Sequence, residues 1–360
     1  MEKSLPSYGL LTQGEVLSWL TETDSARMET LWARADGVRR RYVGDAVHLR
    51  GLVEISNHCV RICGYCGISL HNRDVPRYRM ESGEIWECAR QAVRLGFGSI
   101  VLQAGEDYGL TRDFIAKLVR RIKEETPLAV TLSLGERPEE DLASWREAGA
   151  DRYLLRFETS DATLYERIHP SLPGRPSDRF ALLARLREMG YEIGSGVMVG
   201  IPGQSYDSLA QDILRFAELD LDMIGVGPFI PHPATPLGEA CLPGAERVQV
   251  PATEDMTYRV LALTRLACPG ANIPSTTALA TLNRETGREL GLARGANVIM
   301  PNLTPRSYRA LYEIYPDKAC IHESAMGHDG ELRSCIESMG RTVGQGPGSR
   351  RESSGPSKEV

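Results

Sequence analysis

The stretch LRGLVEISNHCVRICGYC, residues 49–66, begins as a β-strand and ends as a loop that carries three cysteines. Its first eight residues, Leu49–Ser56, are the first of a series of short apolar runs. Cys59, Cys63 and Cys66 follow that run directly, with the spacing C-x3-C-x2-C. The stretch therefore predicts a strand that places three thiols on one loop.

From about residue 48 onward, short apolar runs alternate with longer amphipathic segments. The predicted strands are Leu49–Ser56, Ser99–Gln103, Leu128–Leu134, Arg152–Arg156, Glu192–Val199, Met223–Gly227, Asn272–Pro274 and Asn297–Met300. The predicted helices span residues 82–95, 112–124, 137–148, 177–190, 205–219, 254–267 and 284–293, with a last one at 306–315. This alternation is typical of parallel α/β folds. A complete (β/α)8 TIM-type barrel is the simplest solution, and an open doubly wound sheet is the alternative.

Several of these strands end in residues that carry chemistry, such as LQAGED, LLRFET and VMVGIPG. The active site of a (β/α)8 barrel lies at the carboxyl ends of its strands. These strand ends therefore favour the barrel.

We expect the barrel to span residues 48–316 and to have an extension at each end. Residues 1–47 predict an N-terminal helical extension, with Thr12 and Asp24 as candidate helix caps. Residues 317–343 predict a C-terminal helical segment. Residues 344–360 are rich in Gly, Ser and Pro and have no apolar pattern, which predicts a disordered tail.

Composition argues against several classes of partner. The formal net charge of the 360 residues is -6, whereas nucleic-acid binding needs a basic face. No stretch approaches the roughly 20 apolar residues that cross a bilayer, and the N-terminus lacks the pattern of a signal peptide. We expect a cytoplasmic protein with no nucleic-acid or membrane partner, whose eight cysteines form no disulfide framework.

The three clustered cysteines predict a metal centre. Thiolates are soft ligands that suit iron–sulfur clusters and zinc. A four-iron cluster needs four ligands, so three local cysteines leave one iron open for another molecule. The alternatives are a zinc loop completed by His58 or His71, or three incidental cysteines.

The cysteine segment resembles the motif CxxxCxΦC of the radical S-adenosylmethionine (SAM) superfamily, with Tyr65 as the aromatic Φ. This resemblance implies one 4Fe-4S cluster on Cys59, Cys63 and Cys66, and reductive cleavage of SAM to a 5′-deoxyadenosyl radical. Its SAM-binding positions match a set of residues in this chain: Tyr65, Gly105, Glu106, Glu158, Arg179 and Met198. Without the resemblance, Glu106 would be a helix-start carboxylate, and Glu158 and Arg179 would pair with each other.

A second resemblance covers residues 48 to 316 and is more specific. The segments RYRM (77–80), VLQAGED (101–107), GPFIPHPATPL (227–237) and NIPSTTA (272–278) are similar to those of the HydE family of FeFe-hydrogenase maturases. The family implies an internal cavity lined by Gln103, Thr131, Arg156, Thr276, Thr277, Tyr308 and Tyr312. Without it, strand propensity would explain the threonines and helix packing would explain the tyrosines.

The family also implies partners. Its substrate is a small-molecule or organometallic iron–cysteine species from a radical SAM tyrosine lyase, and its product passes to a GTP-binding scaffold. Ferredoxin or flavodoxin is the expected electron donor. The chain departs from the family near its C-terminus, where Cys320 remains but His328 and Glu331 replace the other cysteines of a second cluster. We therefore expect no second cluster, and structural or incidental roles for Cys320 and Cys335.

Three hypotheses follow. The first is a maturase of the FeFe-hydrogenase two-iron subcluster. The second keeps the radical chemistry but changes the substrate, as in a mutase or sulfur-inserting enzyme like methylornithine synthase or biotin synthase. The third is a non-catalytic iron–sulfur carrier.

Overall fold

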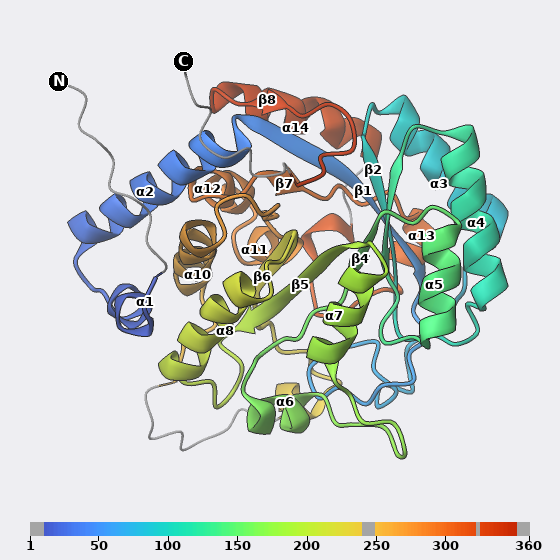
Figure 1. Cartoon of the computed structure of the whole chain (residues 1–360), viewed down its shortest axis with the longest axis horizontal. Coiled ribbons are helices and arrows are strands. Elements are labelled where there is room, and N and C mark those ends of the chain that lie inside the picture. The colour runs from blue at the N-terminus through green and yellow to red at the C-terminus, as the bar shows by residue number, and fades with distance from the viewer. Residues whose placement is uncertain (1–10, 240–248, 322–324, 351–360) are drawn as a thin grey trace.

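The computed structural model describes residues 11–239, 249–321 and 325–350 (Figure 1). Cys241 and the side chains of Cys320 and His328 lie outside the described part, so the expectation of no second cluster stays a prediction. Among the described residues, no helix combines the length and apolar character that crossing a membrane requires.

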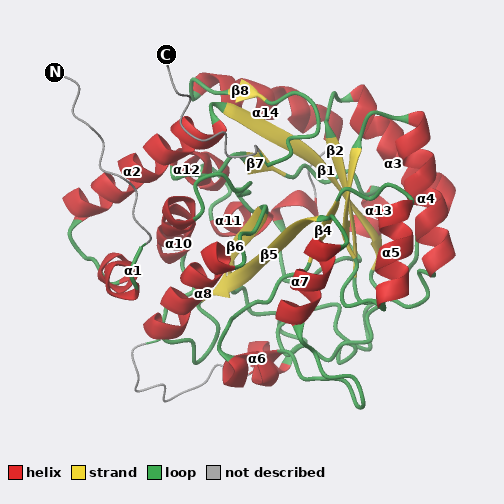
Figure 2. Cartoon of the chain, in the orientation of Figure 1, coloured by secondary structure: helices red, strands yellow, loops and turns green. Residues whose placement is uncertain are grey.

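Parallel strands form one sheet at the centre of the molecule, with helices outside it (Figure 2). The order of neighbouring strands is β6-β5-β4-β3-β2-β1-β7, and β8 pairs with the start of β1. The bounds are β1 Ala46–Ser56, β2 Ser99–Ala104, β3 Ala129–Ser133, β4 Arg152–Leu154, β5 Glu192–Val199, β6 Met223–Pro228, β7 Val298–Ile299 and β8 Thr342–Val343. The prediction of an α/β fold with parallel strands is confirmed.

The prediction of a complete barrel is wrong at its seventh strand position, because residues 272–274 do not form a strand. They make only isolated parallel bridges, Met223 with Asn272 and Pro274 with Val298. The side chain of Asn297 takes over part of the ladder, since its Oδ1 accepts from the Ile273 amide at 2.9 Å. A side-chain amide thus substitutes for a backbone partner, and the sheet is a partial barrel.

Helices follow the strands and pack on the outer face of the sheet: α3 contacts β1, α4 contacts β3, α7 contacts β5 and α10 contacts β6. The helix bounds are α1 Gln13–Leu20, α2 Ser25–Val43, α3 Ser82–Arg94, α4 Arg112–Glu125, α5 Glu139–Glu147, α6 Ala162–Ile168, α7 Arg179–Glu188, α8 Tyr206–Glu218, α9 Pro236–Glu239, α10 Glu254–Ala267, α11 Thr277–Leu282, α12 Gly287–Ala293, α13 Arg306–Arg309, the 3-10 helix η1 Ala319–Ile321 and α14 Ala325–Ser338. The sequence did not predict α6, α9 or α11, which are short.

The N-terminal helices α1 and α2 begin where the sequence predicts. The Thr12 side chain accepts from the Glu15 amide, and Glu15 returns a bond to the Thr12 amide, which is a capping box. Asp24 accepts from the amides of Ala26 and Arg27 at the start of α2. Both helices pack against α10, and α1 also packs against α8.

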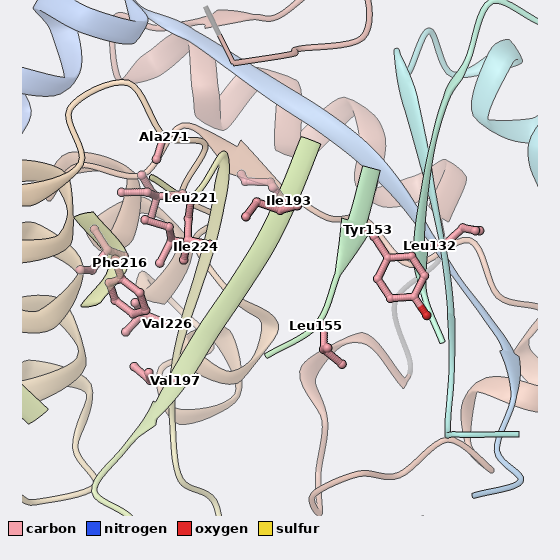
Figure 3. Packing of buried hydrophobic residues seen from close by; sticks show 14 of the residues in the cluster. Leu132, Tyr153, Leu155, Ile193, Val197, Phe216, Leu221, Ile224, Val226 and Ala271 are labelled. Carbon is pink, nitrogen blue, oxygen red and sulfur yellow. The ribbon is translucent and has the colours of Figure 1, made fainter. Parts of the chain in front are cut away.

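The main core lies between the sheet and the helices (Figure 3). Side chains of a strand alternate between the two faces of a sheet. In β5, Val197 and Val199 therefore join this core while Met198 lines the interior of the sheet. Phe216 of α8 and Val226 of β6 complete the same layer and are fully buried.

The tail is a second correction, because residues 344–350 follow a defined path across the amino ends of the strands. The carbonyl of Gly348 accepts from Arg50 and Asn272, and that of Pro347 accepts from Ser99. Gly- and Pro-rich composition predicts disorder only when no surface offers donors to the backbone. Here the side chains at the amino ends of the strands offer such donors. Residues 351–360 lie outside the described residues.

Arg265 holds the irregular seventh strand position together and gives the first prediction. It is fully buried, and its guanidinium donates to the carbonyls of Pro269, Ala271 and Gly295 and to Asn297 Oδ1. Arg265→Leu removes a donor from all four acceptors, of which Asn297 Oδ1 keeps another, the Ile273 amide. We expect the free energy of unfolding to fall by about 3 kcal/mol or more.

Urea denaturation checks this. Arg90→Leu is the matched control, because Arg90 is exposed and paired with Glu87. We expect the control to change the free energy of unfolding by about 1 kcal/mol or less. An Arg265→Leu protein as stable as this control would contradict the assignment.

Candidate active site

The inside of the partial barrel holds a cavity of about 340 Å³. Cys59, Tyr65 and Cys66 line it at the carboxyl ends of the strands. Arg50 of β1 and Asn272 line it near the amino ends. The three-cysteine loop therefore lies at one end of a chamber that runs through the sheet.

The cysteine loop has no regular secondary structure, so its backbone carbonyls need other partners. Arg77 supplies them: Nη1 donates to the carbonyls of Asn57 and Ile68, and Nη2 donates to those of Ser69 and Asn72, all at 2.5–2.8 Å. One guanidinium thus closes the loop from both sides of the cysteines. Arg77 was not among the residues predicted for the site, although it lies in the RYRM segment.

The three thiols are close enough to influence one another. Burial, and then the neighbouring Cys59, raise the pKa of Cys66 to about 12. Burial also raises the pKa of Cys59 and of Cys63. Without a metal the thiols stay protonated at neutral pH, so binding a cluster releases protons.

The donor set fits a four-iron cluster. In the described residues, no three His, Cys, Asp or Glu side chains converge on a position for a single metal ion. A cluster is wider than one ion, so its thiolates need not converge on one point. Three soft sulfur donors, of which Cys59 and Cys66 line the cavity, would hold such a cluster and would leave one iron without a protein ligand.

Gly105 lets the end of β2 approach this loop. Its amide donates to the carbonyl of Ser56 at 3.1 Å. A Cβ atom at this position would lie 2.3 Å from the His58 carbonyl oxygen and 2.8 Å from Cys59 Cβ. Only glycine fits without moving the cysteine loop.

Glu106 faces away from the cavity. Its carboxylate accepts from Arg61 Nε and from the Glu136 amide, both at 2.9 Å, and it is 3% exposed. It therefore anchors the cysteine loop through Arg61, which lies between Cys59 and Cys63. It does not cap a helix either, since α4 begins only at Arg112.

Glu136 connects the loop to α7. One of its oxygens pairs with Arg61 Nη2 at 2.7 Å, and the other pairs with Arg179 Nε at 3.0 Å. The sequence predicted neither Arg61 nor Glu136. The available signal was position: Arg61 lies inside the cysteine motif, and Glu136 follows the third strand in the run TLSLGE.

Arg179 lies beside the loop without lining the cavity. Besides its bond to Glu136, it donates to the Arg156 carbonyl through Nη1 and to His169 Nε2 through Nη2. These contacts use three of the five N–H donors of a guanidinium. One N–H donor therefore remains on each terminal nitrogen for a further acceptor.

Glu158 is the most unusual residue of the site. Its φ of 62° places a residue with a side chain in the left-handed region, and two backbone hydrogen bonds to β5 hold it there. The carboxylate is buried and lines the cavity. Its Oε2 lies 3.3 Å from Arg156 Nη2 and has no hydrogen-bond partner. Glu158 and Arg179 therefore do not pair with each other.

Met198 lines the cavity at the end of β5, beside Tyr65. The turn after it depends on Gln204, whose Oε1 accepts from the Gly200 amide at 2.7 Å. The Nε2 of the same side chain donates to the Met198 carbonyl at 3.1 Å. The turn that follows the predicted SAM-binding residue Met198 is thus held by hydrogen bonds within the segment.

Of the residues predicted to contact substrate, all but one line the cavity: Gln103, Thr131, Arg156, Thr276, Thr277 and Tyr312. Tyr308 is the exception, and that prediction is corrected. Its ring stacks on Tyr78 at 4.6 Å, and its hydroxyl donates to Glu84 at 2.8 Å. The helix there ends at Arg309, which leaves Tyr308 on the outer side.

One pair of wall residues was missed. Lys318 and Glu54 form a buried ion pair, and both line the cavity. Lys318 also donates to the Tyr312 carbonyl at 2.9 Å, which fixes the tyrosine beside Gln103. The two are 264 residues apart in the sequence, so no local pattern indicates the pair.

Comparison with known proteins identifies relatives. A model of the radical SAM superfamily matches residues 53–217. The chain is 45% identical over 332 residues to the FeFe-hydrogenase maturase subunit HydE of Thermotoga maritima, covering 92% of each protein. It is 30% identical over 294 residues to 3-methylornithine synthase of Methanosarcina acetivorans, covering 80% of this chain and 79% of that one.

Solved structures share the fold. Methylornithine synthase (PylB) matches with a TM-score of 0.76 and 24% identity, over 94% of this chain and 95% of that chain. The FeFe-hydrogenase maturase HydG from Carboxydothermus hydrogenoformans matches with a TM-score of 0.74 and 16% identity, over 93% of this chain and 76% of that chain.

The close approach at Gly105 can be tested by substitution. In Gly105→Ala the new methyl group displaces the cysteine loop, and we expect the iron bound per chain after anaerobic reconstitution to fall at least about twofold. Gly83→Ala is the control, because a Cβ at Gly83 would have no heavy atom within 4 Å. Equal iron content in the two variants would show that the contact does not position the loop.

His169 predicts a pH dependence of stability. Burial, and then Arg179, lower its pKa to about 2, so it stays neutral in the folded protein. In the unfolded chain His169 takes up a proton below about pH 6.5. The free energy of unfolding therefore decreases as the pH is lowered, by up to about 1.4 kcal/mol per pH unit.

We expect the decrease in the free energy of unfolding at low pH to be smaller in His169→Gln, measured by urea unfolding at pH 7, 6 and 5. His71→Gln, at an exposed position, is expected to keep the slope of the unsubstituted protein. The same slope in His169→Gln would contradict the assignment.

Proposed function

Because this chain belongs to the radical SAM superfamily, and within it to the family of the FeFe-hydrogenase maturase HydE, we propose that it acts in assembly of the FeFe-hydrogenase two-iron subcluster. It is a SAM-cleaving enzyme that uses a 4Fe-4S cluster and SAM. The share of the chain that aligns with the maturase supports the same role for the whole protein.

In this proposal Cys59, Cys63 and Cys66 would hold the cluster, and the iron without a protein ligand would be available to SAM. When bound, the cluster supplies the electron that splits the sulfonium of SAM into methionine and a 5′-deoxyadenosyl radical. The protein's part is to orient SAM and to keep the chamber dry. Arg77 and the Arg61–Glu106 pair hold the cysteine loop in place.

The conformation of Glu158 is the observation that best supports a SAM site. A left-handed backbone at a residue with a side chain costs about 1–3 kcal/mol and tends to persist where function needs it. Here it directs a buried carboxylate, with one oxygen lacking a hydrogen-bond partner, into the cavity beside the cysteines. The SAM ammonium group suits this carboxylate, and the two spare donors of Arg179 suit the SAM carboxylate.

The part of the cavity between SAM and the amino ends of the strands would bind the substrate. We propose a cysteine-bound iron species with carbonyl and cyanide ligands, supplied by a radical SAM tyrosine lyase. Arg156, Thr276 and Thr277 would meet its carboxylate, while Gln103, Thr131 and Tyr312 line the wall. A GTP-binding scaffold would receive the product, and ferredoxin or flavodoxin would supply the electron.

The second candidate is a carbon-skeleton mutase, which the 30% identity to methylornithine synthase favours. Its substrate would be an amino acid without iron. The two candidates share every step up to the radical and differ only in which molecule the radical attacks.

One experiment separates them. The anaerobically reconstituted protein is mixed with SAM and dithionite, and 5′-deoxyadenosine is measured with the cysteine-bound iron species, with amino acids or alone. We expect the iron species to stimulate nucleoside formation at least about tenfold. Stimulation only by an amino acid would replace the maturase by the mutase.

Cys63→Ala is expected to abolish nucleoside formation, because it removes one of the three thiolates. Cys335→Ala is the control: its thiol donates to Glu289 on the outer helices and does not line the cavity. Full activity of Cys63→Ala would contradict the cluster assignment.

A further inference from the structure

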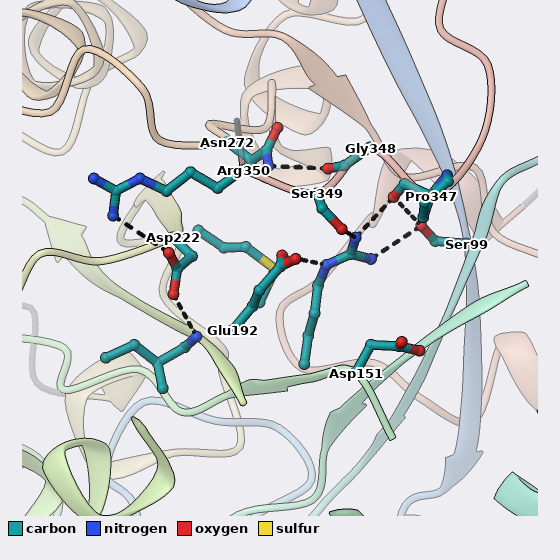
Figure 4. A network of polar contacts seen from close by, with 12 residues as sticks. Ser99, Asp151, Glu192, Asp222, Asn272, Pro347, Gly348, Ser349 and Arg350 are labelled. Carbon is teal, nitrogen blue, oxygen red and sulfur yellow. Dashed lines mark hydrogen bonds and ion pairs between the residues drawn. The ribbon is translucent and has the colours of Figure 1, made fainter. Parts of the chain in front are cut away.

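The segment Gly344–Arg350, named here the C-terminal strap, crosses the amino ends of the strands (Figure 4). It follows β8, which pairs with Ala46 and Val47 at the start of β1. The Gly344 amide continues this pairing by donating to the Val47 carbonyl at 2.8 Å. The strap is thus at the end of the sheet opposite the cysteine loop.

Three side chains separate the strap from the cavity. Arg50, Met223 and Asn272 line the cavity near the amino ends of the strands. Arg50 Nη2 and Asn272 Nδ2 both donate to the Gly348 carbonyl at 3.0 Å, and Arg50 Nη1 contacts Met223 Sδ at 2.9 Å. The Gly348 carbonyl of the strap therefore holds the side chains of Arg50 and Asn272 in place.

A second set of bonds ties the strap to other strands. The Pro347 carbonyl accepts from Ser99 Oγ of β2 at 2.9 Å and from Arg152 Nη2 of β4 at 2.8 Å. Arg152 Nη2 also donates to Ser349 Oγ at 2.9 Å, and Arg152 is fully buried. At the far end, Arg350 pairs with Asp220 before β6.

The backbone of the strap fits closely against the sheet. A Cβ atom on Gly98, just before β2, would lie 1.6 Å from the Gly346 carbonyl oxygen. Gly348 has a φ of 60°, and a Cβ there would lie 2.6 Å from the His48 ring. No layer of water fits between the strap and the strands at these points.

We propose that the C-terminal strap is part of the active site: it forms the outer floor of the cavity and excludes water from the substrate. SAM and the cluster would fill the carboxyl end of the chamber, so the strap closes the other end. Without it, Arg50 and Asn272 would lose their acceptor and would recruit water. The use of the floor in catalysis rests on the proposed function, whereas closure of the cavity does not.

A buried reporter thiol tests closure. Val298 of β7 lines the cavity and is 2% exposed, and Val298→Cys changes the side-chain volume little. The reconstituted protein with SAM bound is treated with iodoacetamide, and alkylation at position 298 is followed by peptide mass spectrometry. We expect slow alkylation when the strap is intact.

Two further variants in this background open the floor. One ends at Val343, and the other is Ser349→Ala with Arg350→Ala, which keeps the backbone but removes two side-chain anchors. We expect alkylation about tenfold faster in the first and an intermediate rate in the second. Arg185→Ala, which breaks an exposed ion pair on α7, is the control and is expected to match the intact strap.

Equal alkylation rates with and without the strap would overturn the proposal, as would fast alkylation in the intact protein. If the shortened chain does not fold, the double substitution decides by the same comparison.

A second readout concerns catalysis. The shortened enzyme is expected to bind SAM with a dissociation constant within about twofold of that of the full chain. The residues proposed to bind SAM are at the carboxyl ends of the strands, opposite the strap. Its product yield per 5′-deoxyadenosine is expected to fall severalfold. An unchanged yield in an enzyme that alkylates faster would overturn the catalytic role of the floor while leaving the proposed function intact.

Discussion

The site depends on keeping an irregular loop rigid while three thiols are buried in it. A loop without secondary structure has carbonyl groups that need donors, and Arg77 satisfies four of them at once. Arg61 fastens the same loop to Glu106 and Glu136. If these guanidinium contacts were lost, the cysteines would no longer share one position at the end of the cavity.

The same principle recurs throughout the molecule. Arg265 at the irregular seventh strand position and Arg152 beside the strap donate mainly to carbonyls and hydroxyls. A buried guanidinium offers five donors in a rigid plane, so it can join several backbone segments where a strand ladder is interrupted. The partial barrel therefore relies on arginine at the places where its ladder is incomplete.

Much of the fold and part of the site could be predicted from the sequence. Local signals sufficed for the strands other than residues 272–274 and β8, for most helices, for the caps at Thr12 and Asp24, and for the position of the cysteine loop. They failed where partners are distant: Glu54 pairs with a lysine 264 residues away, and Tyr308 faces Glu84 instead of the cavity. The strap was misread because its Gly and Pro residues suit close packing as well as disorder, and only the surface beneath them decides which occurs.

In the proposed function, one iron of the cluster is open to SAM and Glu158 holds the SAM amino group. Electron–nuclear double resonance on the reduced, reconstituted protein with ¹⁵N-labelled SAM tests this most directly. We expect a ¹⁵N hyperfine coupling from the amino nitrogen to the cluster, weakened in Glu158→Gln. Absence of any coupling in the unsubstituted protein, with SAM bound, would contradict it.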